Sequence, residues 1–173
     1  MPVYRIKARE LTPEGFKQYG TVIETPADDN DAIAEDRYTY WPSVGVFNTT
    51  TNQMLIGITR LYMRPFRTCV LERQFETESI MLPLTGDILL IVSKNKGMDP
   101  EETADYKAAE AFIIKRGKGV IFKPGVWYWT PNPIGGDQDV LCCVQKPGDK
   151  DRCLKQNFPR GETLEVILDP ETI

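Results

Sequence analysis

Short segments in which apolar and polar residues alternate recur along the chain, and this two-residue period predicts β-strands. Residues 3–7 alternate in this way, and residues 21–24 can also be extended. Further segments are rich in β-branched or aromatic residues and are separated by turn residues. These predicted strands span residues 43–47, 54–64, 68–75, 79–82, 87–93, 111–115, 119–122, 126–129, 139–146 and 163–168.

One short helix and two polar segments interrupt this pattern. Thr12 is a suitable N-cap with Pro13 at the first helical position, so we expect one or two helical turns ending near Tyr19. Residues 27–37 are acidic and predict a polar loop, either a lid over a site or a plain surface loop. Residues 94–109 are the longer polar interruption, in which a single helical turn can start at residue 100.

Repeated short strands without a second run of helices indicate an all-β sandwich or barrel rather than a parallel sheet covered by helices. The chain has 173 residues, 41% of them hydrophobic and 27% charged. This is enough to bury the core of one compact domain, so we expect residues 1–173 to form a single domain.

Charge and apolar patterning exclude several kinds of partner. The net charge is −4 and the basic residues are scattered, which argues against nucleic acid or an anionic membrane surface as a partner. No apolar run approaches the ~18 residues of a membrane span, and no signal-peptide core follows the first residues. We therefore expect a cytoplasmic protein whose four cysteines are reduced thiols.

The chain contains no histidine. Histidine is the most versatile general base near neutral pH and the commonest neutral metal ligand. Its absence excludes Ser-His-Asp and Cys-His catalysis and any metal centre held by imidazole.

Residues 117–132 combine two glycines, an apolar run, a Pro-Gly turn, a Trp-Tyr-Trp cluster and a closing asparagine. The segment resembles the second conserved motif of the cupin superfamily, with Tyr128 in the histidine position and Asn132 as the terminal asparagine. The first cupin motif ends in a glycine, for which Gly86 is the candidate. The resemblance implies an all-β, cupin-like barrel or jelly roll (a double-stranded β-helix) with a short N-terminal helix.

Counting back from Gly86 gives the other three customary metal positions of a cupin. The four positions are Glu72, Gln74, Ser79 and Tyr128. Only Glu72 is a strong ligand, whereas a catalytic metal centre needs about three good donors. The resemblance therefore implies a cupin with neither metal nor cofactor.

Several blocks narrow the resemblance to the ureidoglycolate lyase family, formerly called ureidoglycolate hydrolase. They are residues 16–24, 71–73 with 82–86, 111–113, and 119–120 with 126–127, in the family's order. Members split ureidoglycolate into glyoxylate and urea on a small β-barrel that usually pairs as a homodimer. The resemblance implies a small carboxylate as substrate and a homodimer, for which Tyr38, Tyr40 and Trp41 would suit the interface. The chain departs from the family at Gln74, Lys123, Tyr128 and Trp129, where the family has histidines.

Splitting a carbinolamide such as ureidoglycolate requires a base, an acid and a cation that holds the carboxylate. Lys123 is a candidate base if burial beside tryptophans favours its neutral form, and Tyr128 is then the acid. Glu72 can act as the base instead, or can orient an arginine, as can Glu78. Gln74 is a candidate substrate contact, and Arg60, Arg64 and Arg73 are candidate clamps for a carboxylate.

Strand alternation limits which of these residues can share a site. Trp127 and Trp129 lie on one strand face and Tyr128 on the other, so the cupin position selects Tyr128 for the lumen and leaves the tryptophans for packing or dimer contact. Arg73 likewise lies on the other strand face from Glu72. It is expected to form an external ion pair unless a bulge intervenes. Arg60 lies in mid-strand among apolar residues, where an unpaired charge is costly, and is the preferred carboxylate partner.

Three functions remain open at this point, in order of preference. The first is a metal-independent lyase or hydrolase for a small carboxylate, using Lys123, Tyr128, Glu72 and Arg60. The second is a metal-free isomerase, epimerase or cyclase for a larger apolar metabolite held by Trp127, Tyr128, Trp129 and Met81. The third is a cupin that binds a small molecule without catalysis.

Overall fold

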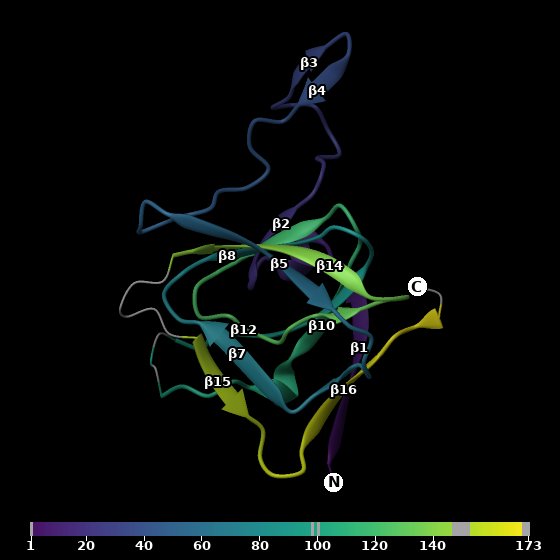
Figure 1. Ribbon diagram of the computed structural model, residues 1–173, viewed down its shortest axis with the longest axis vertical. Helices are drawn as coiled ribbons and strands as arrows, with labels where there is room; N and C mark the ends of the chain where they lie inside the picture. The colour runs from purple at the N-terminus through teal and green to yellow at the C-terminus, as the bar shows by residue number, and fades with distance from the viewer. Residues whose placement is uncertain (1, 98, 100, 147–152, 171–173) are drawn as a thin grey trace.

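The computed structural model describes residues 2–97, 99, 101–146 and 153–170, and nearly all of its regular structure is β. Two curled sheets face each other to form a barrel, and a separate hairpin projects from it (Figure 1). The expectation of an all-β, cupin-like barrel or jelly roll with a short N-terminal helix is confirmed.

The larger sheet has nine strands, most of them in the order β15-β7-β12-β9-β10-β1-β16-β6, with β13 also paired to β9. Their bounds are β15 Cys153–Asn157, β7 Val70–Gln74, β12 Trp127–Tyr128, β9 Ile88–Ser93, β10 Glu110–Ile114, β1 Val3–Glu10, β16 Thr163–Ile167, β6 Arg67–Thr68 and β13 Asn132–Pro133. The smaller sheet has the order β2-β11-β8-β14-β5. Its strands are β2 Gly20–Ile23, β11 Gly119–Phe122, β8 Ser79–Pro83, β14 Gln138–Gln145 and β5 Met54–Leu61.

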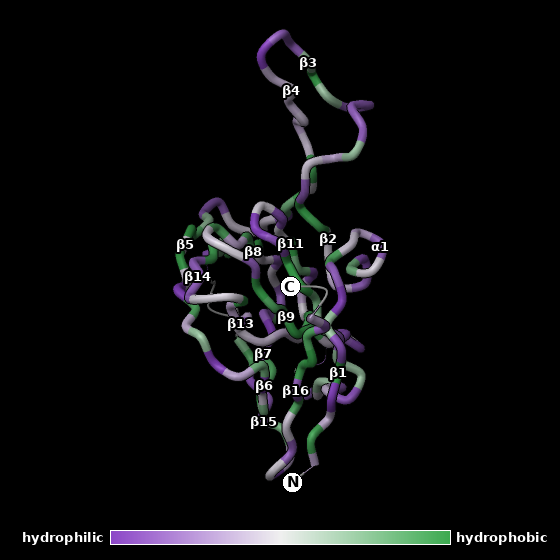
Figure 2. Tube along the Cα trace, turned by 90° about the vertical axis from the view of Figure 1, so that its right-hand side faces the viewer, coloured by the Kyte–Doolittle hydropathy of each residue, from purple (hydrophilic) through white to green (hydrophobic). Residues whose placement is uncertain are grey.

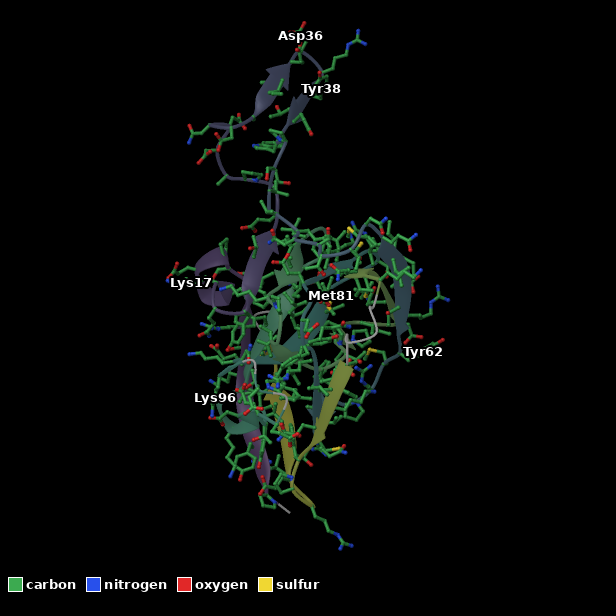
Figure 3. All side chains as sticks on the ribbon, turned by 90° about the vertical axis from the view of Figure 1, so that its left-hand side faces the viewer. Lys17, Asp36, Tyr38, Tyr62, Met81 and Lys96 are labelled. Carbon is green, nitrogen blue, oxygen red and sulfur yellow. The ribbon has the colours of Figure 1, made fainter. Side chains whose placement is uncertain are left out.

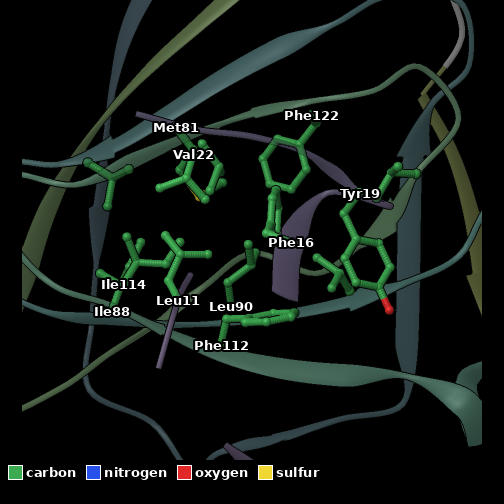
Figure 4. Packing of buried hydrophobic residues seen from close by; sticks show 14 of the residues in the cluster. Leu11, Phe16, Tyr19, Val22, Met81, Ile88, Leu90, Phe112, Ile114 and Phe122 are labelled. Atoms are coloured by element: carbon green, nitrogen blue, oxygen red, sulfur yellow. The ribbon is translucent and has the colours of Figure 1, made fainter. Parts of the chain in front are cut away.

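The N-terminal helix α1, Pro13–Phe16, forms where its capping residues predict it. The Thr12 hydroxyl accepts a hydrogen bond from the Gly15 amide at 3.1 Å, which satisfies one of the free donors of the first turn. The helix ends three residues earlier than expected, and a turn carries the chain to Tyr19. Phe16 and Tyr19 then insert into the barrel interior beside Phe112 (Figure 4).

Two apolar cores lie on opposite faces of the larger sheet. Ile88, Leu90 and Val92 of β9 point into the lumen between the sheets, whereas Leu89 and Ile91 point into a second core on the outer face. The short 3₁₀ helix η1, Tyr106–Ala108, covers this second core. A strand that is buried on both faces is expected to be apolar throughout, as β9 nearly is.

The connection from β2 to β5 forms an arm that leaves the barrel. Its tip is the hairpin of β3, Ile33–Glu35, and β4, Tyr38–Tyr40, in which every residue is exposed. Asp36 and Tyr38 lie at this tip, far from Met81 in the barrel (Figure 3). The hairpin combines a polar turn with apolar positions in β3 (Figure 2). The hairpin lies partly in the segment expected to be a loop, because its turn carries charges that hide the strand pattern.

Three other strand predictions differ from the structure. The predicted strand at 43–47 is wrong, since these residues have no strand partner and pass instead near the Ile121 side chain on the outer face of the smaller sheet. Strand β15 was not predicted, because an edge strand with lysine and glutamine has a weak apolar signal. Strand β5 ends at Leu61 rather than at residue 64.

Strand β1 continues three residues beyond its predicted end at residue 7, and the two-residue strands β6 and β13 were not predicted as separate strands. The other strands lie within about two residues of their predicted bounds. The helical turn expected from residue 100 falls partly outside the described residues, and η1 follows at Tyr106. Within the described ranges, no helix is long and apolar enough to cross a membrane.

Candidate functional site

A cavity of about 130 Å³ opens into the barrel lumen between the two sheets. Its walls combine apolar side chains with a small number of polar groups. The lining residues are Thr59, Leu61, Glu72, Met81, Tyr128, Thr130, Pro131, Val140 and Cys142. Glu72 is the one carboxylate among these nine, and Tyr128 is the one phenol.

Glu72 and Tyr128 are brought together by strand pairing. They are opposite each other in the antiparallel pair of β7 and β12, and residues opposite each other share one face of a sheet. The Pro124-Gly125 turn before β12 requires glycine, because Gly125 has φ 78°. The Gly125 amide donates to the Gln74 carbonyl at 2.8 Å, which fixes the turn against the end of β7.

The environment of Tyr128 keeps its hydroxyl protonated. Burial raises the pKa of this phenol, the nearby Glu72 charge raises it further, and a hydrogen bond with the Gln74 side chain opposes the shift. A neutral phenol can donate a hydrogen bond or a proton to a group in the cavity. Gln74 therefore acts on the site through Tyr128.

Glu72 contacts two groups on the neighbouring edge strand β15. Lys155 Nζ lies 3.5 Å from Glu72 Oε2, and the Cys153 thiol donates toward the same oxygen at 3.8 Å. Most of the Glu72 side chain is buried, whereas Lys155 is exposed. The carboxylate is thus held at the wall and keeps an oxygen for a ligand, which is the requirement for a general base.

Two thiols lie near this pair, and sequence reasoning did not place them there. Burial raises the pKa of both Cys142 and Cys153, so each is a neutral thiol at neutral pH. Cys142 lines the cavity opposite Gly57 on β5. Its position follows from register: Val140 and Cys142 face inward, two residues apart, and the sequence alone could not choose between Cys142 and Cys143.

The four customary metal positions of a cupin hold only one strong metal ligand, Glu72. Glu72 and Tyr128 line the cavity, while Gln74 and Ser79 are not among its lining residues. Within the described part of the chain, no cluster of three Cys, Asp or Glu side chains is placed to hold a metal ion. The donors present do not fit a divalent cation, which prefers several charged or imidazole ligands.

The preferred carboxylate partner, Arg60, lies on the outer surface. Its Nε and Nη2 donate to the two Asp139 carboxylate oxygens at 2.8 and 2.9 Å. Register explains this position, because Arg60 is opposite Asp139 across β5 and β14, on the face away from Val140. Ile58 and Tyr62, which share the face of Arg60, are themselves exposed, so no buried charge needs a ligand there.

Arg73 is fully buried, with 0% exposure, on the face of β7 away from the cavity. Expected as an external ion pair, it is instead enclosed by the segment that follows β9. Its guanidinium pairs with Glu102 at 3.5 Å and donates to the Asp99 carbonyl at 2.7 Å. It also lies over the Trp127 ring, 4.6 Å from the centroid. Arg73 therefore stabilises the second core and does not reach the cavity.

The remaining candidates also lie away from the cavity. Trp127 is buried in the second core, and Trp129 packs against the same core. Lys123 is exposed, and its Nζ donates to the Lys17 carbonyl at 2.6 Å. Glu78 accepts two hydrogen bonds from Asn48, which attaches the end of the arm to the barrel. Strand alternation had predicted the separation of the tryptophans from Tyr128.

The fold and cavity define a class of protein: a cupin-like β-barrel with a carboxylate and a phenol in the wall of its lumen. The model of the family described as ureidoglycolate lyase matches residues 3–165, and the chain belongs to this family. A ureidoglycolate lyase of Pseudomonas savastanoi pv. phaseolicola is 28% identical over 167 residues, covering 94% of each chain. A ureidoglycolate lyase of Mesorhizobium japonicum is also 28% identical, covering 94% of this chain and 98% of that one.

Among solved structures, the chain is similar to a dTDP sugar isomerase from Desulfovibrio desulfuricans. The TM-score is 0.47 at 13% identity, covering 82% of this chain and 85% of that one. It is also similar to a dTDP-6-deoxy-D-glucose-3,5-epimerase from Legionella pneumophila, with a TM-score of 0.43 at 12% identity, covering 87% and 88%.

Proposed function

We propose that the protein is a carbon–nitrogen lyase that splits ureidoglycolate, or a close relative of it, into glyoxylate and urea. The observation that carries the proposal is the Glu72–Tyr128 pair, opposite each other in the wall of a small lumen cavity. Membership of the ureidoglycolate lyase family supports it. Glu72 and Tyr128 replace Lys123 as the working pair, since Lys123 lies on the surface bound to Lys17.

In the proposed reaction, Glu72 takes the proton of the substrate hydroxyl as the C=O bond of glyoxylate forms. The carbon–nitrogen bond breaks, its electron pair goes to the ureido nitrogen, and that nitrogen takes the proton of Tyr128. Release of urea and glyoxylate leaves Glu72 protonated and Tyr128 ionised, and one proton transfer between them restores both. Their opposite positions in the strand pair favour this return.

The size of the cavity favours a small substrate over the larger apolar metabolite of the second hypothesis. Sites for drug-sized ligands occupy ~300 Å³ or more, whereas this cavity has about 130 Å³. In addition, the two tryptophans required by the second hypothesis pack into the other core.

The proposal is tested by incubating the purified protein with ureidoglycolate and measuring glyoxylate. Glu72→Gln and Tyr128→Phe should each lower kcat by roughly 10²-fold or more, as loss of a general base or acid does. Lys123→Met is the matched control and should leave the rate unchanged. Product no faster than the uncatalysed reaction would refute the lyase and favour a binding protein. Loss of activity in Lys123→Met alone would refute the assignment of the pair.

We further propose that the reaction needs no metal or other cofactor. The chemistry of the donor set supports this, because Glu72 is the one strong ligand among the four customary positions. Exhaustive treatment with a chelator should leave the rate of glyoxylate release unchanged. A loss that added metal restores would contradict the proposal.

We also propose that two copies of the chain pair in the cytoplasm, as the family resemblance implies. Two exposed apolar features of the chain support pairing. Every residue of the edge strand β5 except Leu61 is exposed, with Ile56 at 73% and Ile58 at 59%, and such an edge is normally covered. The arm projects nearby with exposed Tyr38 and Tyr40. The four free cysteines fit a reducing compartment.

A further inference from the structure

Of the three arginines considered as carboxylate partners, Arg64 is the one whose guanidinium bonds to residues that line the cavity. Its Nη2 donates to the carbonyls of Thr130 and Pro131, both at 2.7 Å. Both of these residues line the cavity. Arg64 follows β5 in sequence, and these two bonds attach its side chain to the segment that follows β12.

The backbone beside Arg64 is held in the same place. Asn132 is buried, and its Nδ2 donates to the Pro65 carbonyl at 3.0 Å and to the Arg64 carbonyl at 3.5 Å. Side chain and main chain of Arg64 are therefore both anchored to residues 130–132. A guanidinium held this way loses little further freedom when it binds a ligand.

The charge of Arg64 has no acidic partner within residues 2–97, 99, 101–146 and 153–170. Carbonyl oxygens are its acceptors, and no ion pair or hydrogen bond to a carboxylate is found for it there. Burial lowers the pKa of its guanidinium, and no neighbouring acid raises it. Leaving a partly buried cation uncompensated is costly, whereas a guanidinium matches the two oxygens of a carboxylate. In contrast, Asp139 already neutralises Arg60, and Glu102 pairs with Arg73.

We infer that Arg64 binds the carboxylate of the substrate at the Thr130–Pro131 side of the cavity and sets the specificity for a 2-hydroxy carboxylate. This inference rests on the proposed lyase function for the hydroxyl that reacts at Glu72. Binding of a carboxylate at Arg64 does not depend on that function. The negative charge of Glu72 in the same cavity repels the carboxylate. The substrate is therefore oriented with its carboxylate at Arg64 and its hydroxyl at Glu72.

A comparison of two substrates tests this inference. N-(hydroxymethyl)urea is the counterpart of ureidoglycolate that lacks the carboxylate. In the unaltered protein, kcat/KM should favour ureidoglycolate, and in Arg64→Met that preference should fall by roughly ten-fold or more. Arg64→Lys should retain part of the preference, because the point charge remains without the planar fork. Arg60→Met, on the outer surface, is the matched control and should retain all of it.

Equilibrium binding separates this inference from the lyase proposal. Binding of oxamate, a small carboxylate that is not split, is measured by calorimetry and needs no turnover. Oxamate should bind the unaltered protein and Arg60→Met with equal affinity. Its affinity for Arg64→Met should be lower by roughly ten-fold or more. If ureidoglycolate is not turned over but oxamate binding depends on Arg64, the lyase proposal fails and the carboxylate site stands.

The inference is overturned if oxamate does not bind the unaltered protein, or binds Arg64→Met with equal affinity. It is also overturned if Arg64→Met lowers kcat/KM for both substrates by the same factor, since a merely structural role would do that. Thermal unfolding of each variant checks the fold, and Arg64→Lys, which keeps the positive charge, provides the readout should Arg64→Met unfold.

Discussion

Arg73 shows what a single residue contributes when its charge is enclosed by the fold. Its guanidinium lies between a core tryptophan and the carbonyl and carboxylate groups of the segment that follows β9. Removing one partner of a buried pair leaves the other uncompensated. We therefore expect Arg73→Ala to lower the free energy of unfolding by about 3 kcal/mol.

Denaturant unfolding followed by tryptophan fluorescence measures this change. Arg60→Ala is the control, because its ion pair with Asp139 is exposed to solvent and should contribute little. An equal loss of stability in the two variants would show that burial does not distinguish these arginines.

Tyr128 gives the protein a pH dependence at the alkaline end. Its pKa is raised above that of an unfolded chain, mainly by burial, and Tyr19 is raised in the same way. Above a pH of about 10, the unfolded chain loses these protons while the folded protein retains them. Stability is therefore fully present below that pH and falls as the pH rises further.

Urea unfolding midpoints measured from neutral pH to above about 10 test this expectation. Tyr128→Phe should show a shallower alkaline decline than the unaltered protein, since one of the phenols with a raised pKa is removed. An identical decline in both would contradict the raised pKa of Tyr128.

At the scale of the element, α1 depends on its cap. The Thr12 hydroxyl is the acceptor for the first-turn amide of Gly15, and the helix places Phe16 in the lumen core. Thr12→Ala should lower the free energy of unfolding by about 1 kcal/mol, whereas Thr12→Ser keeps the hydroxyl and should restore most of it. Denaturant midpoints decide, and a serine variant as unstable as the alanine variant would exclude the cap as the cause.

Strand β12 has only two residues, yet it positions Tyr128 in the cavity wall. Its two residues point to opposite cores: Trp127 into the outer one, beside Arg73, and Tyr128 into the lumen, beside Phe122. Pairing with β7 then places Tyr128 opposite Glu72. The same alternation that keeps Trp127 out of the cavity thus brings the Tyr128 phenol beside the Glu72 carboxylate.

At the scale of the whole molecule, the β3–β4 hairpin at the tip of the arm is separable from the barrel. The hairpin of β3 and β4 pairs with no other strand among the described residues (Figure 1), and an isolated two-stranded hairpin is marginally stable in water. Replacing residues 33–40 with a short Gly-Ser linker should leave the unfolding midpoint of the barrel unchanged. The same change should shift the molecular mass in solution from that of a pair to that of one chain, if the arm makes the contact.

Light scattering after gel filtration measures this shift. Ile56→Lys on the exposed edge strand is a second, independent variant and should have the same effect. A pair that survives both changes would contradict pairing through the arm and β5.

The sequence by itself determined the all-β class, the capped helix, most strand bounds and the family. Turns and strands are set by the conformational preferences of neighbouring residues, and these preferences can be read directly from the sequence. It also placed Tyr128 and Glu72 in the lumen, because their spacing from the motif glycines puts both at cupin positions that face the barrel interior. It did not foresee β15 or the β3–β4 hairpin, whose polar residues carry a weak strand pattern.

Only the tertiary structure decided which charged residues are free for a ligand. The sequence preferred Arg60 among the three arginines, but their partners come from distant segments: Asp139 for Arg60, the segment after β9 for Arg73, and carbonyls beside the cavity for Arg64. A charge is neutralised, enclosed or left for a substrate by whatever packs against it, and side chains far apart in the sequence determine that packing.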